Sequence, residues 1–179
     1  MPEKVSTTLL IEDSLIKGTK LVEAVVHRVL LKSFSGANTK PMKDYLEPNP
    51  EISPDLVVPH AGTNDLKQKE PQHVADSIVD LAREIENSCE ATVVVSELTS
   101  KRDKLNEVMK TTNKYLKGYC RQNGWKLIQH QNNTEKGLNR GGLHLNFQVD
   151  LIFLRIFKHA KTETTRCPPT SSLTYKKQY

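Results

Sequence analysis

The chain has 179 residues, close to the usual length of one domain, with 36% hydrophobic residues, 26% charged residues and a formal net charge of +5. This balance excludes disordered and collagen-like chains, and no apolar run approaches the roughly 20 residues that a bilayer-spanning helix needs. The positive charge permits attraction to phosphate polymers without establishing it.

The N-terminus and the cysteines bear on the compartment. The first residues lack the apolar core and the small-residue cleavage site of a secretory signal. Cys89, Cys120 and Cys167 are odd in number and far apart, so neither a disulfide framework nor a zinc site is predicted. A reducing, cytoplasmic location is therefore expected.

The histidines do not indicate a metalloenzyme. None of them shows a ligand spacing such as His-x-x-x-His, so we expect no metal and no other cofactor. The six histidines are His27, His60, His73, His130, His144 and His159.

Short runs rich in β-branched residues alternate with amphipathic segments along the chain. A run of leucines and valines at helical spacing, ending at Val29, predicts a helix after the first strand, and Asn123-Gly124 is typical of a helix C-terminus. The predicted strands are residues 5–11, 30–34, 55–58, 92–95 and 125–128. The predicted helices are residues 21–29, 42–46, 71–88, 105–123 and 149–157.

Strands that alternate with helices favour a parallel sheet with right-handed crossovers. We therefore predict a three-layer α/β/α sandwich with a five-stranded parallel sheet, of the flavodoxin-like type. The predicted domain covers residues 1–158. Residues 159–179 are rich in Thr, Ser, Pro and Lys without an apolar period, which predicts a flexible basic tail.

Four polar or small residues follow predicted strands or lie in polar loops, where a parallel sheet places its functional site. They are Ser14, Gly36, Asn64 and His144, and all are expected beyond the carboxyl ends of the strands. Taken singly, each has an ordinary structural explanation: a helix N-cap, a turn glycine, a loop-capping asparagine and a surface histidine.

Together, four sequence blocks resemble those of the SGNH (GDSL-like) hydrolases, in the same order. The blocks are Asp13–Gly18, Phe34–Thr39, His60–Leu66 and Leu143–Asn146, and the resemblance covers about residues 5–158. Gly62-Thr63-Asn64-Asp65-Leu66 is the most specific match. More narrowly, the chain resembles the esterase-type domain in the first open reading frame of LINE-class (non-LTR) retrotransposons.

This resemblance implies a serine esterase that hydrolyses carboxylic (acyl) esters, with a small acyl-ester or lipid-like substrate. Ser14 would be the nucleophile, through an acyl-serine intermediate, and His144 its general base. The oxyanion hole would consist of the Ser14 and Gly36 N–H groups and the Asn64 side chain.

Three positions depart from the family pattern. Gly141 stands where the family has the aspartate that orients the histidine, so the triad lacks its carboxylate. Glu12 replaces a glycine and is expected to place a bulky anion beside a tight turn. Pro59 lacks the N–H that a central strand uses, which predicts a local distortion of that strand. These departures predict weakened activity.

A second hypothesis is an inactive descendant that binds nucleic acid or a protein partner. Four cations share one face of the helix predicted over residues 105–123, and they could contact phosphates. An ordinary solvated helix face is the alternative, because no aromatic stacking platform or RNA-binding signature accompanies them. The four cations are Lys110, Lys114, Lys117 and Arg121.

Overall fold

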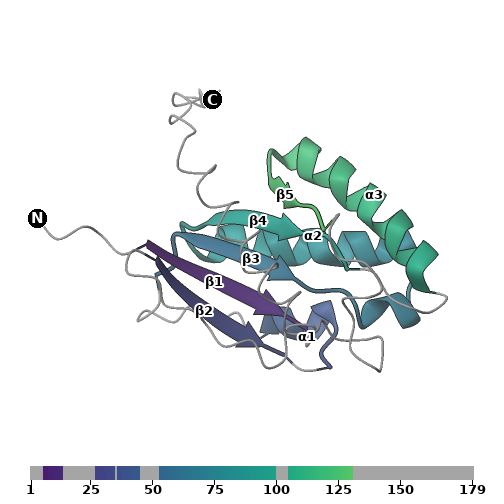
Figure 1. Cartoon of the computed structure of the whole chain (residues 1–179), viewed down its shortest axis with the longest axis horizontal. Helices are drawn as coiled ribbons and strands as arrows, with labels where there is room; N and C mark the ends of the chain where they lie inside the picture. Colours follow the sequence, from purple (N-terminus) through teal and green to yellow (C-terminus); the bar gives the residue numbers. More distant parts are fainter. Residues whose placement is uncertain (1–5, 14–26, 35, 45–52, 100–104, 131–179) are drawn as a thin grey trace, which may run out of the picture.

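The computed structural model describes residues 6–13, 27–34, 36–44, 53–99 and 105–130. Five strands form one parallel sheet in the order β2-β1-β3-β4-β5 (Figure 1). This order is that of a flavodoxin-like doubly wound sheet, whose switch point lies between β1 and β3. The strands are β1 (Ser6–Glu12), β2 (His27–Ser33), β3 (Leu56–His60), β4 (Thr92–Ser96) and β5 (Lys126–Ile128).

Within the described residues, three α-helices connect strands β2 to β5, and a short 3-10 helix follows β3. Helices α1, α2 and α3 pack on one face of the sheet, with α2 between α1 and α3 (Figure 1). Among the described helices, none is long and apolar enough to cross a membrane. The helices are α1 (Thr39–Asp44), η1 (Asp65–Lys67), α2 (Pro71–Ser88) and α3 (Leu105–Asn123).

Alternation along the strands buries both faces of the sheet. Ile11, Val57 and Val95 belong to the core cluster beneath α2 and α3. Leu10 and Val58, one position out of phase, point to the opposite face and are also buried. Strands buried on both faces explain the continuous apolar runs in the sequence, and the predicted α/β architecture is confirmed.

The helix bounds follow from the apolar spacing and the end signals. Helix α2 runs from Pro71 to Ser88, as predicted, with its proline in the first turn, where a missing N–H costs nothing. Helix α3 ends at Asn123, and Gly124 takes φ 70°, the left-handed conformation expected there. The predicted helix at residues 149–157 and the tail at 159–179 lie outside the described residues.

One sequence prediction needs correction. Val29 is predicted in a helix, but it lies in β2 opposite Thr8 of β1, because β-branched residues suit a strand as well as a helical stripe.

The interruption predicted at Pro59 falls on one side of its strand. The ladder between β1 and β3 continues through Pro59 to His60. On the other side, β3 pairs with β4 only at Leu56 and Val57, so the proline, which has no N–H, lies beyond that ladder.

Candidate active site

At the carboxyl edge of the sheet, Asp13, the residue after β1, binds the loop after β3. Its buried Oδ2 accepts the backbone N–H of Thr63 at 2.7 Å and that of Asn64 at 3.4 Å. Charge-assisted hydrogen bonds to backbone N–H groups are about twice as strong as neutral ones. The Asp13 carboxylate therefore holds the loop after β3 against the end of β1.

The Asn64 side chain joins three loops at this edge. Its Nδ2 donates to the backbone carbonyl of Asp13 at 3.2 Å and to that of Ala37 at 3.0 Å. An amide nitrogen carries two hydrogens, so both donors are directed at carbonyl oxygens. Asn64 thus lies where the sequence placed it, next to the Gly36 loop, but it must release one carbonyl before it can donate to a reacting oxygen.

Asp65 fastens this loop to α1. Its Oδ2 accepts the backbone N–H of Thr39 at 2.9 Å and the Thr39 hydroxyl at 3.2 Å. Its Oδ1 forms an ion pair with Lys69 at 2.7 Å. The carboxylate is fully buried, and these partners offset the cost of burying its charge. The loop after β3 is therefore fixed by side chains at consecutive positions.

Gly62 is required by its backbone conformation and by its surroundings. It takes φ 108°, where other residues are strained, and an added Cβ would lie 2.7 Å from Ile78 Cδ1 of α2. Gly36, at φ 77°, is exposed and has no heavy atom near its missing Cβ. The two glycines therefore have different roles. Gly62 allows the loop to pack closely against α2, whereas Gly36 allows the backbone to form an open turn.

Gly62→Ala is expected to lower the free energy of unfolding by about 2–4 kcal/mol, because backbone strain and a clash in a packed core add together. Gly118→Ala is the matched control, since Gly118 lies within α3 with nothing within 4 Å of its missing Cβ. That control is expected to stabilise the protein by about 0.5–1 kcal/mol. Urea unfolding of both variants measures the difference, and equal stabilities would contradict this description of the loop.

A second polar cluster, which sequence reasoning missed, lies on the sheet face opposite α2. The buried Ser96 hydroxyl is 2.8 Å from His60 Nδ1 and 2.7 Å from His130 Nε2. The two imidazole rings meet edge to face, with centroids 5.7 Å apart. One signal could have revealed this cluster: His60 ends β3, Ser96 ends β4 and His130 follows β5, so all three belong to the same edge.

Burial keeps both imidazoles of this cluster neutral. It lowers the pKa of His60 well below the usual value, with a further decrease from His130 nearby. Burial also lowers the pKa of His130 to about 3. The half-buried carboxyl of Glu97 accepts the backbone N–H of His130 at 3.3 Å, and desolvation raises the pKa of Glu97. Two neutral rings and one hydroxyl can share hydrogens without a buried charge.

The remaining predicted site residues divide into two groups. Ser14, Gly141 and His144 lie outside the described residues. Glu12 is described, and it is a fully buried residue of β1 whose register partner on β3 is His60, so it belongs to the strand rather than to a tight turn. The four cations of the second hypothesis are all exposed on α3: Lys110, Lys114, Lys117 and Arg121.

Comparisons with known proteins agree with this architecture. Residues 15–148 match the model of the GDSL-like Lipase/Acylhydrolase family. This range contains Gly36, Asn64 and His144 and begins one residue after Ser14. Among curated proteins, none matches the chain.

Several solved structures share the fold at low sequence identity. A lipase/acylhydrolase from Enterococcus faecalis is 17% identical, with a TM-score of 0.69 over 93% of this chain and 100% of its own. A psychrotrophic esterase from Pseudoalteromonas sp., solved inhibited by monoethylphosphonate, is 14% identical, with a TM-score of 0.72 over 90% and 100%. An acetylxylan esterase from Geobacillus stearothermophilus is 15% identical, with a TM-score of 0.67 over 86% and 93%.

The strand order, the loops joined at the carboxyl edge and the match over most of the chain point to one conclusion. The chain belongs to the GDSL-like lipase/acylhydrolase family.

Proposed function

We propose that this protein is a serine esterase that hydrolyses carboxylic esters through an acyl-Ser14 intermediate. The observation that carries the proposal is the set of hydrogen bonds joining Asp13, Asn64 and the Gly36 loop. Ser14 follows Asp13 directly in the sequence, and Asp13 is hydrogen-bonded to Asn64, one of the proposed oxyanion donors. Membership of a GDSL-like acylhydrolase family supports the same chemistry.

In the proposed reaction, His144 accepts the Ser14 hydroxyl proton as the oxygen attacks the ester carbonyl carbon. The carbonyl oxygen becomes an oxyanion, which the N–H groups of Ser14 and Gly36 and the side chain of Asn64 stabilise. Collapse breaks the bond to the alkoxy group, and the alcohol leaves with the proton from His144. Water then attacks the acyl-serine by the same steps, releasing the carboxylic acid.

Two features predict a slow reaction. Gly141 provides no carboxylate for the imidazole of His144, so activity rests on a serine and histidine dyad. Both Asn64 Nδ2 hydrogens are engaged by the carbonyls of Asp13 and Ala37. Donating to an oxyanion costs Asn64 one of these hydrogen bonds, worth about 0.5–1.5 kcal/mol net.

Hydrolysis of p-nitrophenyl acetate by purified protein tests the proposal. Ser14→Ala and His144→Ala are each expected to reduce the rate to background, because one removes the nucleophile and the other its base. Ser88→Ala is the control: this hydroxyl bonds only to the Glu84 carbonyl at the end of α2, among the contacts of the described residues. Equal rates for all four proteins would overturn the proposal.

The proposal has a wider context. The resemblance to the LINE-class esterase-type domain supports an origin in a retrotransposon reading frame, with residues 1–158 as the hydrolase domain and 159–179 as a basic tail. A cytoplasmic location is part of the same proposal. Limited proteolysis tests the domain boundary: a stable fragment ending near residue 158 is expected, and cleavage spread through residues 53–99 would contradict it.

A second candidate function is phosphate-backbone binding through α3. Its supporting observation is that all four α3 cations are exposed along one helix, although Lys110 pairs with Glu107 at 2.7 Å. If this function operates, replacing Lys114 or Lys117 by Gln lowers the magnitude of the slope of log affinity against log salt by about 0.7 each for a single-stranded RNA. An unchanged slope would reject it.

A further inference from the structure

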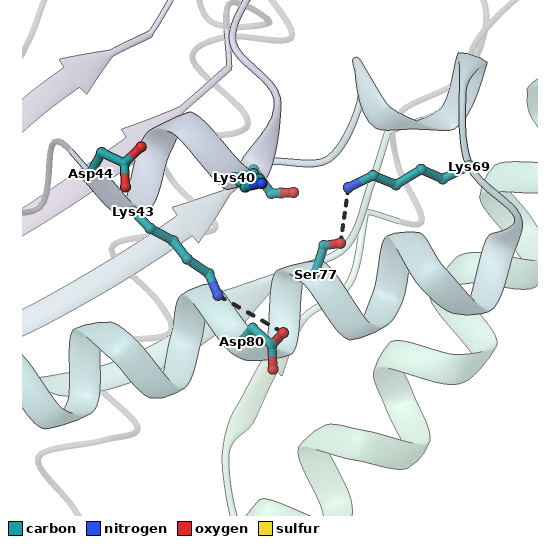
Figure 2. Close-up of a pocket in the computed structure, with 7 residues that line it drawn as sticks. Lys40, Lys43, Asp44, Lys69, Ser77 and Asp80 are labelled. Carbon is teal, nitrogen blue, oxygen red and sulfur yellow. Dashed lines mark hydrogen bonds and ion pairs between the residues drawn. The ribbon is translucent and has the colours of Figure 1, made fainter.

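A pocket of about 340 Å³ lies between α1 and the middle of α2 (Figure 2). Helix α1 forms one wall, and Lys69 together with two residues of α2 forms the other. The lining residues are Thr39, Lys40, Lys43, Asp44, Lys69, Ser77 and Asp80. Three of the seven side chains carry ammonium groups, and two carry hydroxyls.

Two of these ammonium groups reach into the pocket from opposite sides (Figure 2). Lys69 Nζ donates to the Ser77 hydroxyl oxygen at 3.1 Å and pairs with Asp65 at 2.7 Å. An ammonium has three hydrogens, so Lys69 retains one donor beyond these two contacts. Its side chain is 32% exposed, which means that packing holds the charge at the pocket rather than in bulk water.

Lys43 approaches from α1. Its Nζ lies 3.8 Å from Asp80 Oδ2, longer than a hydrogen bond, and the Lys43 side chain is 33% exposed while Asp80 is 57% exposed. An exposed, loose ion pair of this kind contributes little to stability. Lys43 can therefore exchange the Asp80 carboxylate for a ligand at small cost.

We infer that this pocket binds a phosphate group, either as free phosphate or as a small phosphate monoester. The lining offers three cations and two hydroxyls against two carboxylates, and Lys69 also pairs with Asp65, which is not among the lining residues. A compact anion with several oxygens can accept the remaining Lys69 donor and replace Asp80 at Lys43. Phosphate carries about −1.5 to −2 at neutral pH and three acceptor oxygens, more than a carboxylate provides. The volume leaves room beyond one phosphate, at the lower end of ligand-site sizes, about 300–1,000 Å³.

The inference is independent of ester hydrolysis and needs a binding readout. Isothermal titration calorimetry with inorganic phosphate and, separately, with glycerol 1-phosphate distinguishes binding of free phosphate from binding of a phosphate monoester. Sodium chloride at equal ionic strength controls for screening. Lys40→Met and Lys43→Met are each expected to weaken binding about tenfold, since each removes a charge-assisted hydrogen bond. Lys69 is kept, because its loss would leave the buried Asp65 without its ion pair.

Asp80→Asn gives the opposite expectation. It removes the carboxylate that competes for Lys43, so affinity is expected to rise about threefold to tenfold. Arg83→Met is the control and is expected to change nothing, because Arg83 is an exposed cation of α2 that bonds Asn123 of α3 and does not line the pocket. Binding that Arg83→Met weakens as much as Lys43→Met does, or affinity that Asp80→Asn leaves unchanged, would overturn the inference. No heat from either phosphate beyond that of chloride would do the same.

Discussion

Gly141→Asp is expected to accelerate ester hydrolysis by about 10²- to 10⁴-fold. A carboxylate three residues before His144 would accept the Nδ1 hydrogen of the imidazole, fix its tautomer and stabilise the imidazolium that forms in the transition state. In serine proteases, losing the equivalent carboxylate interaction lowers turnover by about 10⁴. The measurement is kcat/KM on p-nitrophenyl acetate, with the rise expected mainly in kcat.

Gly142→Asp is the matched control for this gain. It adds the same charge one position along the chain, out of register with the family's aspartate, and is expected to leave the rate near that of the unmodified protein. The double variant Ser14→Ala with Gly141→Asp is expected to be inactive. A gain equal to that of Gly142→Asp, or a gain that survives in the double variant, would show that the added carboxylate does not act through His144.

Acid is expected to destabilise the fold strongly through His60 and His130. Both pKa values are lowered in the folded state, so the unfolded chain binds protons first as the pH falls below about 6.5. Stability is therefore lost as the pH decreases from about 6.5 toward the folded pKa, which is about 3 for His130. The loss is about 1.4 kcal/mol per pH unit for each histidine, or about 2 kcal/mol from His130 alone by pH 5.

Glu97 acts in the opposite direction. Its pKa is raised in the folded state, so it favours folding below about pH 4.5 and loses this contribution as the pH rises through its folded pKa. Two buried imidazoles outweigh one half-buried carboxyl, and the net slope of stability against pH is expected to be positive between about pH 5 and pH 6.5.

Urea unfolding at several pH values isolates the histidines. His60→Asn and His130→Gln retain a polar atom near Ser96 without a titrating ring. Each is expected to reduce by about one the number of protons taken up on unfolding, which sets the slope of the unfolding free energy against pH. His73→Gln is the control, because His73 is exposed on α2. A slope that is the same in all three variants and in the unmodified protein would show that the cluster is not the source of acid sensitivity.

Elements with one strong pattern could be predicted from the sequence, and those with two compatible patterns could not. Helix α2 combines an N-terminal proline with an uninterrupted apolar stripe, and its predicted bounds match the structure. The segment before β2 carries valines that satisfy a helical stripe and a strand equally well. Pairing with β1 assigns Val29 to β2, and that contact depends on a distant part of the chain.

For the Gly36 and Asn64 loops, the position at the sheet edge could be predicted but the contacts could not. Because parallel strands end at one edge, the sequence brings the Gly36 and Asn64 loops together. The sequence does not predict how the Asp13 and Ala37 carbonyls are oriented. That orientation determines which groups accept the Asn64 side-chain hydrogens. The residues His60, Ser96 and His130 lie at the same edge, but they are far apart in the sequence and form no motif.

The most direct test of the proposed esterase is covalent trapping of the nucleophile. A fluorophosphonate reacts with an activated serine hydroxyl and remains attached to it, so reaction with this protein followed by peptide mass mapping identifies the modified residue. We predict a single adduct on Ser14, lost in Ser14→Ala and slowed in His144→Ala. Labelling that persists in Ser14→Ala, or an unmodified Ser14 in folded protein after prolonged exposure, would contradict the account.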